Sequence, residues 1–189
     1  PLLIGNLFQQ FYNMADTLIV GRTLGVEALA AVGCTGGLMF LILGFVIGFT
    51  AGLAIITAQR FGAGRRRAVR RSFAVCIVLS SIMTVLLTAV SVAFARPVLE
   101  LLQTPPEILE AAHAYIIVIS WGIGAAMLFN LLSNVLRALG DSRTPLYFLV
   151  LACVLNIALD LALILRFGMG PAGAAVATVA SQLVAGLCC

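Results

Sequence analysis

Six apolar runs, each long enough to cross a bilayer, recur along this chain of 189 residues. A transmembrane helix needs about 20 mostly apolar residues. Strands of a membrane barrel would instead alternate apolar and polar residues over about ten positions, and these runs are continuously apolar. The sequence therefore predicts an all-α, polytopic transmembrane helix bundle with spans at 1–20, 33–58, 72–94, 111–138, 146–165 and 172–189.

The composition excludes a soluble domain. The chain is 62% hydrophobic and 10% charged, whereas soluble domains carry about 25% charged residues. Its five cysteines lie in apolar stretches without metal-ligand spacing, so we expect no metal centre and no cofactor. No segment of the sequence resembles a nucleic-acid-binding module, so we expect no nucleic-acid partner. We expect the chain to lie in a lipid bilayer. Because the chain starts at Pro1 and stops within an apolar run, we expect it to be a piece of a longer protein.

Short polar segments separate the predicted spans. The segment "GAGRRRAVRR" (62–71) follows the second span, and "LGDSRTP" (139–145) follows the fourth. Gly21 and Gly25 should interrupt the chain after the first span. Asp141, in the second of these turns, is expected to act as a local cap or ion-pair partner.

The arginines predict the orientation of the bundle. With six spans, alternate turns share a side, and the two sides then hold eight and three arginines. The positive-inside rule makes the richer side cytoplasmic, which predicts a multi-pass protein of the plasma (cytoplasmic) membrane with a cytoplasmic N-terminus. Contact with acidic lipids is the lesser interpretation of the arginine cluster. The richer side has Arg60, Arg65, Arg66, Arg67, Arg70, Arg71, Arg137 and Arg143, and the other has Arg22, Arg96 and Arg166.

The second span carries Gly44, Gly48 and Gly52 at four-residue spacing. Small residues at this spacing lie on one face of a helix and let a second helix approach closely. We therefore expect this face to pack against another span.

The first span has one polar face. Asn6, Gln9, Asn13 and Asp16 recur at i, i+3, i+7 and i+10, which places them in one arc of a helix. Such a face must look into a bundle or a wet cavity, because lipid cannot solvate it. We predict that Gln9 and Asn13 line a substrate cavity.

The fifth and sixth spans add polar residues at a matching depth. Asn156 and Asp160 are four residues apart on one face, and Thr178 lies in the sixth span. From their distances to the ends of their spans, Asp16, Asp160 and Thr178 each lie roughly 8–9 Å below the outer surface of the bundle, with Asn156 about one turn deeper. The four side chains are predicted to form one cluster.

Such a cluster favours cation chemistry. Two carboxylates in a low dielectric cannot both ionise cheaply, so one of them can load and unload a proton. The same oxygens, with an amide and a hydroxyl, could instead hold a desolvated Na+. In the fourth span, Asn130 and Asn134 are candidates either for the substrate cavity or for hydrogen bonds between helices.

Four segments resemble the multidrug and toxic compound extrusion (MATE) family. They are "QQFYNMADTLIVGRTLGVEALAAVG" (9–33), "LRALGDSRTPLY" (136–147), "NIALD" (156–160) and "GPAGAAVATVASQ" (170–182). The resemblance covers essentially the whole chain. It implies the N-terminal six-helix lobe of a twelve-helix transporter, with the C-terminal lobe of the same protein as its partner.

The resemblance also implies a function and a site. Such proteins are antiporters, not enzymes, and export organic, often cationic, compounds in exchange for H+ or Na+. Their cation site falls on Asp16, Asn156, Asp160 and Thr178 of this sequence, and a cavity-lining glutamine falls on Gln9. One departure is Leu161, because proline often follows the aspartate of the fifth span in the family.

Two other functions are weighed against this one. A lipid-linked oligosaccharide flippase of the same superfamily often lines its cavity with basic residues, whereas the charges at membrane depth are acidic here. An intramembrane lipid-modifying enzyme would need paired aspartate motifs for Mg2+, and Asp16 and Asp160 are isolated on different spans.

Overall fold

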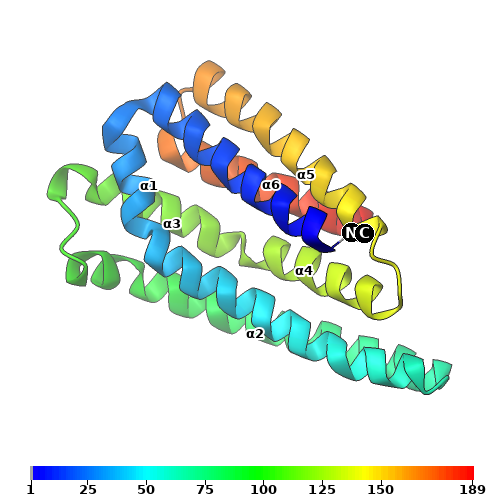
Figure 1. Cartoon of the computed structure of the whole chain (residues 1–189). Helices are drawn as coiled ribbons and strands as arrows, with labels where there is room; N and C mark the ends of the chain where they lie inside the picture. Colours follow the sequence, from blue (N-terminus) through cyan, green and yellow to red (C-terminus); the bar gives the residue numbers. More distant parts are fainter. Residues whose placement is uncertain (1) are drawn as a thin grey trace.

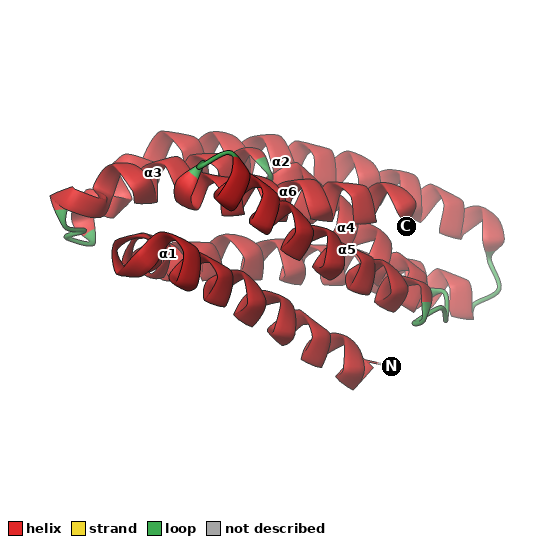
Figure 2. Ribbon diagram, turned by 90° about the horizontal axis from the view of Figure 1, so that it is seen from above, coloured by secondary structure: helices red, strands yellow, loops and turns green. Residues whose placement is uncertain are grey.

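The computed structural model describes residues 2–189, without the side chains of residues 2–6, 8, 9, 12, 13, 15, 16, 24, 26 and 27. All regular structure in this part of the chain is helical, which confirms the predicted all-α class. The helices run along one common direction, with the loops gathered at the two ends (Figure 1, Figure 2). They are α1 (Leu2–Gly62), α2 (Arg66–Leu101), α3 (Pro106–Trp121), α4 (Ile123–Ala138), α5 (Thr144–Asp160), the π-helix η1 (Leu161–Arg166) and α6 (Gly170–Cys188).

The first two predicted spans form the two arms of α1. The helix leaves regular geometry at Gly25, with φ 84° and ψ −172°, and the chain folds back there (Figure 1). A positive φ of this kind suits glycine, which has no Cβ to clash. Gly21 stays helical, so only one of the two predicted interruptions occurs. The second arm also begins well before residue 33, because no residue between Gly25 and Gly33 breaks the helix.

The predicted fourth span is two helices. α3 and α4 bend by 46° at a break beside Gly122. Among the described residues, four helices are long and apolar enough to cross a membrane, and the bent pair would make a fifth. The remaining predicted span, 1–20, is helical from Leu2, but many of its side chains lie outside the described part.

The glycine face of the second arm does not pack as predicted. Gly44, Gly48 and Gly52 are exposed, and no described atom lies within 4 Å of a Cβ placed on any of them. The arm instead packs through Ile42 and Val46, which are buried against the α4 cluster around Met127. No described part of this chain packs on the glycine face, because four-residue spacing defines a face of a helix but not which face meets a neighbour.

The arginine-bearing turns lie at the two ends of the bundle as the alternation of spans requires. Both chain termini, the α1–α2 turn and the α4–α5 turn lie at one end (Figure 1). The bend of α1, the α2–α3 turn and the η1–α6 turn lie at the other. This arrangement supports an even number of crossings, while the cytoplasmic assignment of the first end stays a prediction.

Asp141 caps the start of α5, as expected for that turn. Its Oδ1 accepts hydrogen bonds of 3.0 Å from the backbone N–H groups of Arg143 and Thr144, and its Oδ2 accepts one of 2.5 Å from the Thr144 hydroxyl. The chain enters this turn through Gly140, whose φ is 92°. The hydrogen bonds from Thr144, first its hydroxyl and then its N–H, hold the pKa of Asp141 below its usual value.

Removal of this cap should produce a pH-dependent loss of stability. Because the pKa is lowered on folding, the contribution of Asp141 is present above the unfolded pKa of about 4 and disappears as the pH falls through the lower folded pKa. We expect Asp141→Ala to melt below the wild type in detergent at pH 7, with the difference shrinking as the pH falls below about 4 through the lower folded pKa. A difference that stays constant over that range would contradict the carboxylate cap.

Candidate cation and substrate sites

Asn156 and Asp160 are fully buried on α5. Each side chain is 0% exposed, although the helix around them is apolar. Asp160 is the last α-helical residue, and the chain continues from Leu161 as the π-helix η1 without a break. π-turns inside helices are frequent at functional sites. The sequence has no local signal for this π-turn, which begins at Leu161, where proline often follows the aspartate in the family.

The amide of Asn156 joins Asp160 to α6. In one orientation, its Nδ2 donates to the Thr178 hydroxyl at 3.3 Å. With the amide turned over, Nδ2 donates to Asp160 Oδ2 at 3.2 Å, and the amide oxygen accepts from the Thr178 N–H at 3.2 Å. We prefer the second orientation for an ionised Asp160, because the first makes the amide oxygen face a carboxylate. The structure thus brings together three of the four predicted cation-site residues.

The surroundings of Thr178 include groups that were not predicted as site residues. Ser181 is buried and donates a hydrogen bond of 2.9 Å to the Thr178 carbonyl. A small enclosed space of ≈ 20 Å³ lies between Thr178, Gln182 and the α3–α4 break at Gly122. Most of its lining is apolar, with Thr178 and Gln182 as the polar side chains. The sequence did contain a signal for Ser181 and Gln182, because they are polar residues of α6 that lie one turn after Thr178.

Asp16 lies on α1, and its side chain is outside the described part of the chain. Val20, which is described, lies one turn further along the same helix. Val20 is 1% exposed and packs with Ile164 of η1 and Ala174 of α6. The first arm of α1 therefore touches η1, which follows Asp160, and α6, which carries Thr178. The structure does not test whether Asp16 joins their cluster.

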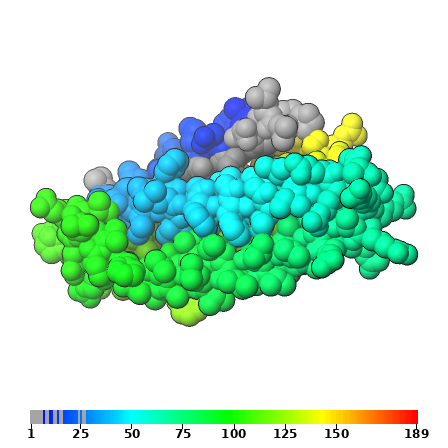
Figure 3. Space-filling view, turned by 90° about the horizontal axis from the view of Figure 1, so that it is seen from below, coloured from blue at the N-terminus to red at the C-terminus, as the bar shows by residue number. Residues whose placement is uncertain are grey.

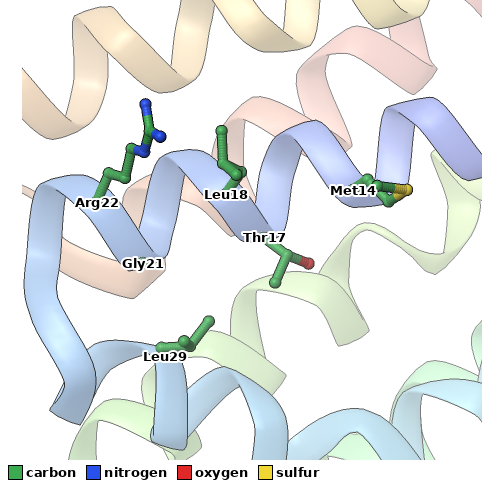
Figure 4. A pocket seen from close by; sticks show the side chains of 6 residues that line it. All are labelled: Met14, Thr17, Leu18, Gly21, Arg22 and Leu29. Carbon is green, nitrogen blue, oxygen red and sulfur yellow. The ribbon is translucent and has the colours of Figure 1, made fainter.

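A hollow of ≈ 560 Å³ opens inside the bend of α1. Figure 4 shows side chains of the first arm and Leu29 of the second arm around it. Its volume is within the range of about 300–1,000 Å³ that suits small-molecule sites. Gln9 and Asn13, the predicted cavity residues, lie outside the described side chains. The observed lining was not predicted, and it comes from both arms of α1: Met14, Thr17, Leu18, Gly21, Arg22 and Leu29.

Asn130 and Asn134 are engaged within the bundle. Asn130 Nδ2 donates to the Ala126 carbonyl at 2.8 Å. Asn134 Nδ2 donates to the Thr50 hydroxyl at 3.1 Å, which joins α4 to α1, and Arg137 donates to Asn134 Oδ1 at 3.3 Å. These contacts favour the helix-bridging interpretation for Asn134. Contact of either residue with a substrate stays a prediction.

Comparison with known proteins identifies the family. The MatE family model matches residues 1–162. The chain belongs to the MatE family. The family consists of transporters and not enzymes, so this chain is part of an integral multi-pass membrane protein.

Relatives of this chain are identical to it at about a third of the aligned positions. The probable multidrug resistance protein YoeA of Bacillus subtilis is 33% identical over 187 residues, which are 97% of this chain and 40% of the relative. A protein of Shewanella oneidensis named FAD transporter is 33% identical over 193 residues, 98% of this chain and 42% of the relative. The chain thus spans about 40% of the length of the curated relatives it matches.

A solved MATE structure has the same fold over this region. The crystal structure of MATE in the bent conformation aligns with a TM-score of 0.92 at 31% identity, covering 100% of this chain and 42% of that one. The bundle described above therefore corresponds to one lobe of a MATE transporter.

Proposed function

We propose that this chain is the N-terminal lobe of a secondary antiporter that exports small organic compounds, often cationic ones, in exchange for H+ or Na+. The observation that carries the proposal is the fully buried Asp160, held by Asn156 beside Thr178. An ionisable side chain at membrane depth is costly and is a functional candidate by default. Relatives named multidrug resistance proteins support the substrate class.

The amide of Asn156 suits a group that gains and loses a charge. An ionised Asp160 only accepts hydrogen bonds, so the Asn156 NH2 group would face it at 3.2 Å. A protonated Asp160 could donate to the amide oxygen, and the NH2 group would then face the Thr178 hydroxyl at 3.3 Å. One side chain can therefore serve both states by turning over. Na+ would instead draw the oxygens of the same residues together.

The first arm of α1 connects this cluster to the hollow. Val20 packs on η1 and α6, while Met14 and Leu18 on other sides of the same arm line the hollow. A shift of the arm when Asp16 or Asp160 takes up a cation would reshape the hollow. Coupled export requires that the cation and the substrate disfavour each other's bound state. The C-terminal lobe would supply the rest of the cavity, and the two lobes would rock about it.

A second candidate function is export of anionic, phosphate-bearing compounds. Arg22 is the charged side chain among the described residues that line the hollow, and a guanidinium suits phosphate. One relative is named FAD transporter. The lipid-linked oligosaccharide flippase is one form of this second candidate, because export of either kind of phosphate-bearing compound needs a basic group facing the cavity.

Efflux from vesicles that contain the complete transporter tests the proposal. We expect a cationic dye to be expelled faster when either a pH gradient or a Na+ gradient is imposed, and the effective gradient identifies the coupling ion. Efflux that neither gradient accelerates would overturn coupled antiport. Parallel assays with FAD distinguish the second candidate, which predicts that FAD is transported and that Arg22→Gln reduces its transport more than that of the dye.

A further inference from the structure

Five arginines project from the tip of the α1–α2 hairpin. They lie within seven consecutive residues, and every one is exposed. Arg60 is different, because it is half-buried and donates from Nη1 to the Ala68 carbonyl at 3.3 Å, which braces the turn. The arginine tip is defined here as Arg65, Arg66, Arg67, Arg70 and Arg71.

The charge of the arginine tip has no counter-charge on its own hairpin. The sequence contains no aspartate or glutamate between Glu27 and Glu100. Among the described side chains, the ion pairs are those of Arg96 with Glu100 and Glu110, both at 3.2 Å, at the opposite end of the bundle. Asp141 lies at the same end as the tip, but its carboxylate already accepts hydrogen bonds from the backbone N–H groups of Arg143 and Thr144.

The position of the arginines on α2 increases this imbalance. Four of them lie in the first six residues of a 36-residue helix whose first turn has no acidic residue and whose N-cap makes no side-chain hydrogen bond. The N-terminus of a helix carries partial positive charge, so cations there are unfavourable and anions are favourable. An anion supplied from outside the chain would relieve both the mutual repulsion of the arginines and their conflict with the helix.

The helices that carry the tip suggest where it lies relative to a bilayer. The two arms that carry it are both candidate membrane spans, Ala28–Gly62 and Arg66–Leu101. Exposed apolar side chains, among them Ile56, Phe61 and Val78, come within a few turns of the arginines. Figure 3 shows the second arm of α1 and α2 side by side over this face, with the tip at its far end. The apolar sides suit acyl chains, so we infer that the arginines lie at the level of the headgroups.

We propose that the arginine tip binds the phosphate groups of anionic phospholipids in the adjoining leaflet. Guanidinium groups bind phosphate oxygens through paired hydrogen bonds, and clusters of four to eight basic residues next to a transmembrane helix attract anionic lipids. This interaction is independent of the transported compound. It adds to the role of the same arginines in orienting the protein, which acts during insertion.

Lipid selectivity of the complete, purified transporter tests the proposal. The protein is reconstituted in phosphatidylcholine vesicles with spin-labelled phosphatidylglycerol, and the association of the labelled lipid is compared with that of labelled phosphatidylcholine. Replacing all five tip arginines with glutamine should lower the preference for phosphatidylglycerol by at least about fivefold. The preference of the wild type should weaken as the salt concentration rises. An unchanged preference in a folded glutamine variant would overturn the proposal.

Two matched variants separate the headgroup contact from other effects. The pair Arg67→Gln/Arg71→Gln should reduce the preference, while Arg96→Gln/Arg166→Gln, which removes the same charge at the other end, should leave it intact. Replacing the five arginines with lysine should keep the preference above that of the glutamine variant, and a fall to that level would contradict a charge-based contact. Equally tight binding of soluble glycerol phosphate in neutral micelles would assign the tip to a soluble anion and overturn the lipid proposal.

Discussion

Replacing Asp160 with asparagine should abolish cation-driven efflux by the complete transporter. Asparagine has nearly the same shape but cannot lose or gain a proton at physiological pH, and it offers Na+ one neutral oxygen in place of a carboxylate. Asp160 is 0% exposed, and no described acidic side chain lies on α5 or α6 to replace it. We expect dye efflux to fall to the level seen without a gradient, in vesicles energised by pH or Na+.

The control for this variant is Asp141→Asn. It makes the same chemical change at an aspartate that caps α5 through Thr144 instead of lying within the apolar helix. We expect it to keep gradient-driven efflux. Size-exclusion profiles and melting temperatures in detergent show whether each variant is folded. Near-normal efflux by a folded Asp160→Asn variant would exclude Asp160 as the coupling residue.

Gly122→Ala should produce the largest loss of stability from the addition of one methyl group. A Cβ at this position would lie 2.0 Å from Val179 Cγ2, far inside contact distance. The backbone itself accepts alanine, because φ is −79° and ψ is −5°, so the overlap with α6 is the cause. Overpacking of this kind costs about 1–3 kcal/mol. We expect a lower melting temperature of the complete protein in detergent.

Two further variants make this prediction specific. Gly124→Ala adds the same atom two residues away, where its nearest neighbour, Thr84 Cγ2, is at 3.4 Å, and it should change stability little. The double variant Gly122→Ala/Val179→Ala should lose less free energy of unfolding than the two single variants lose together. We expect this difference, the coupling energy, to be about 1 kcal/mol or more. Additive losses would mean that Val179 does not limit the approach of α6 to the α3–α4 break.

Local patterns were sufficient for the secondary structure and for part of the candidate site. The apolar runs predicted the helices, because a backbone in lipid must satisfy its own hydrogen bonds. The four-residue spacing of Asn156 and Asp160 and the matching depth of Thr178 predicted their proximity, and the structure brings these three residues into contact. These predictions succeeded because periodicity and distance from a helix end are properties of a single segment.

Contacts between segments were beyond such patterns. The glycine face of the second arm was assigned to packing, yet it is exposed, whereas Gly122 packs so closely against Val179 that a Cβ there would overlap it. The Arg22-lined hollow and the π-turn after Asp160 also had no signal in the chain alone. Each of them depends on how helices rotate, bend and cross.

The sequence by itself determined a helical membrane bundle, the alternation of its arginines and the buried polar residues of its fifth and sixth spans. Apolarity and helical period act within about 20 residues, so they can be recognised without a partner helix. Only the tertiary structure decided which faces meet, because van der Waals packing between apolar helices depends on shape more than on residue class. The neighbours of Asn156 and the opening beside Arg22 follow from that packing.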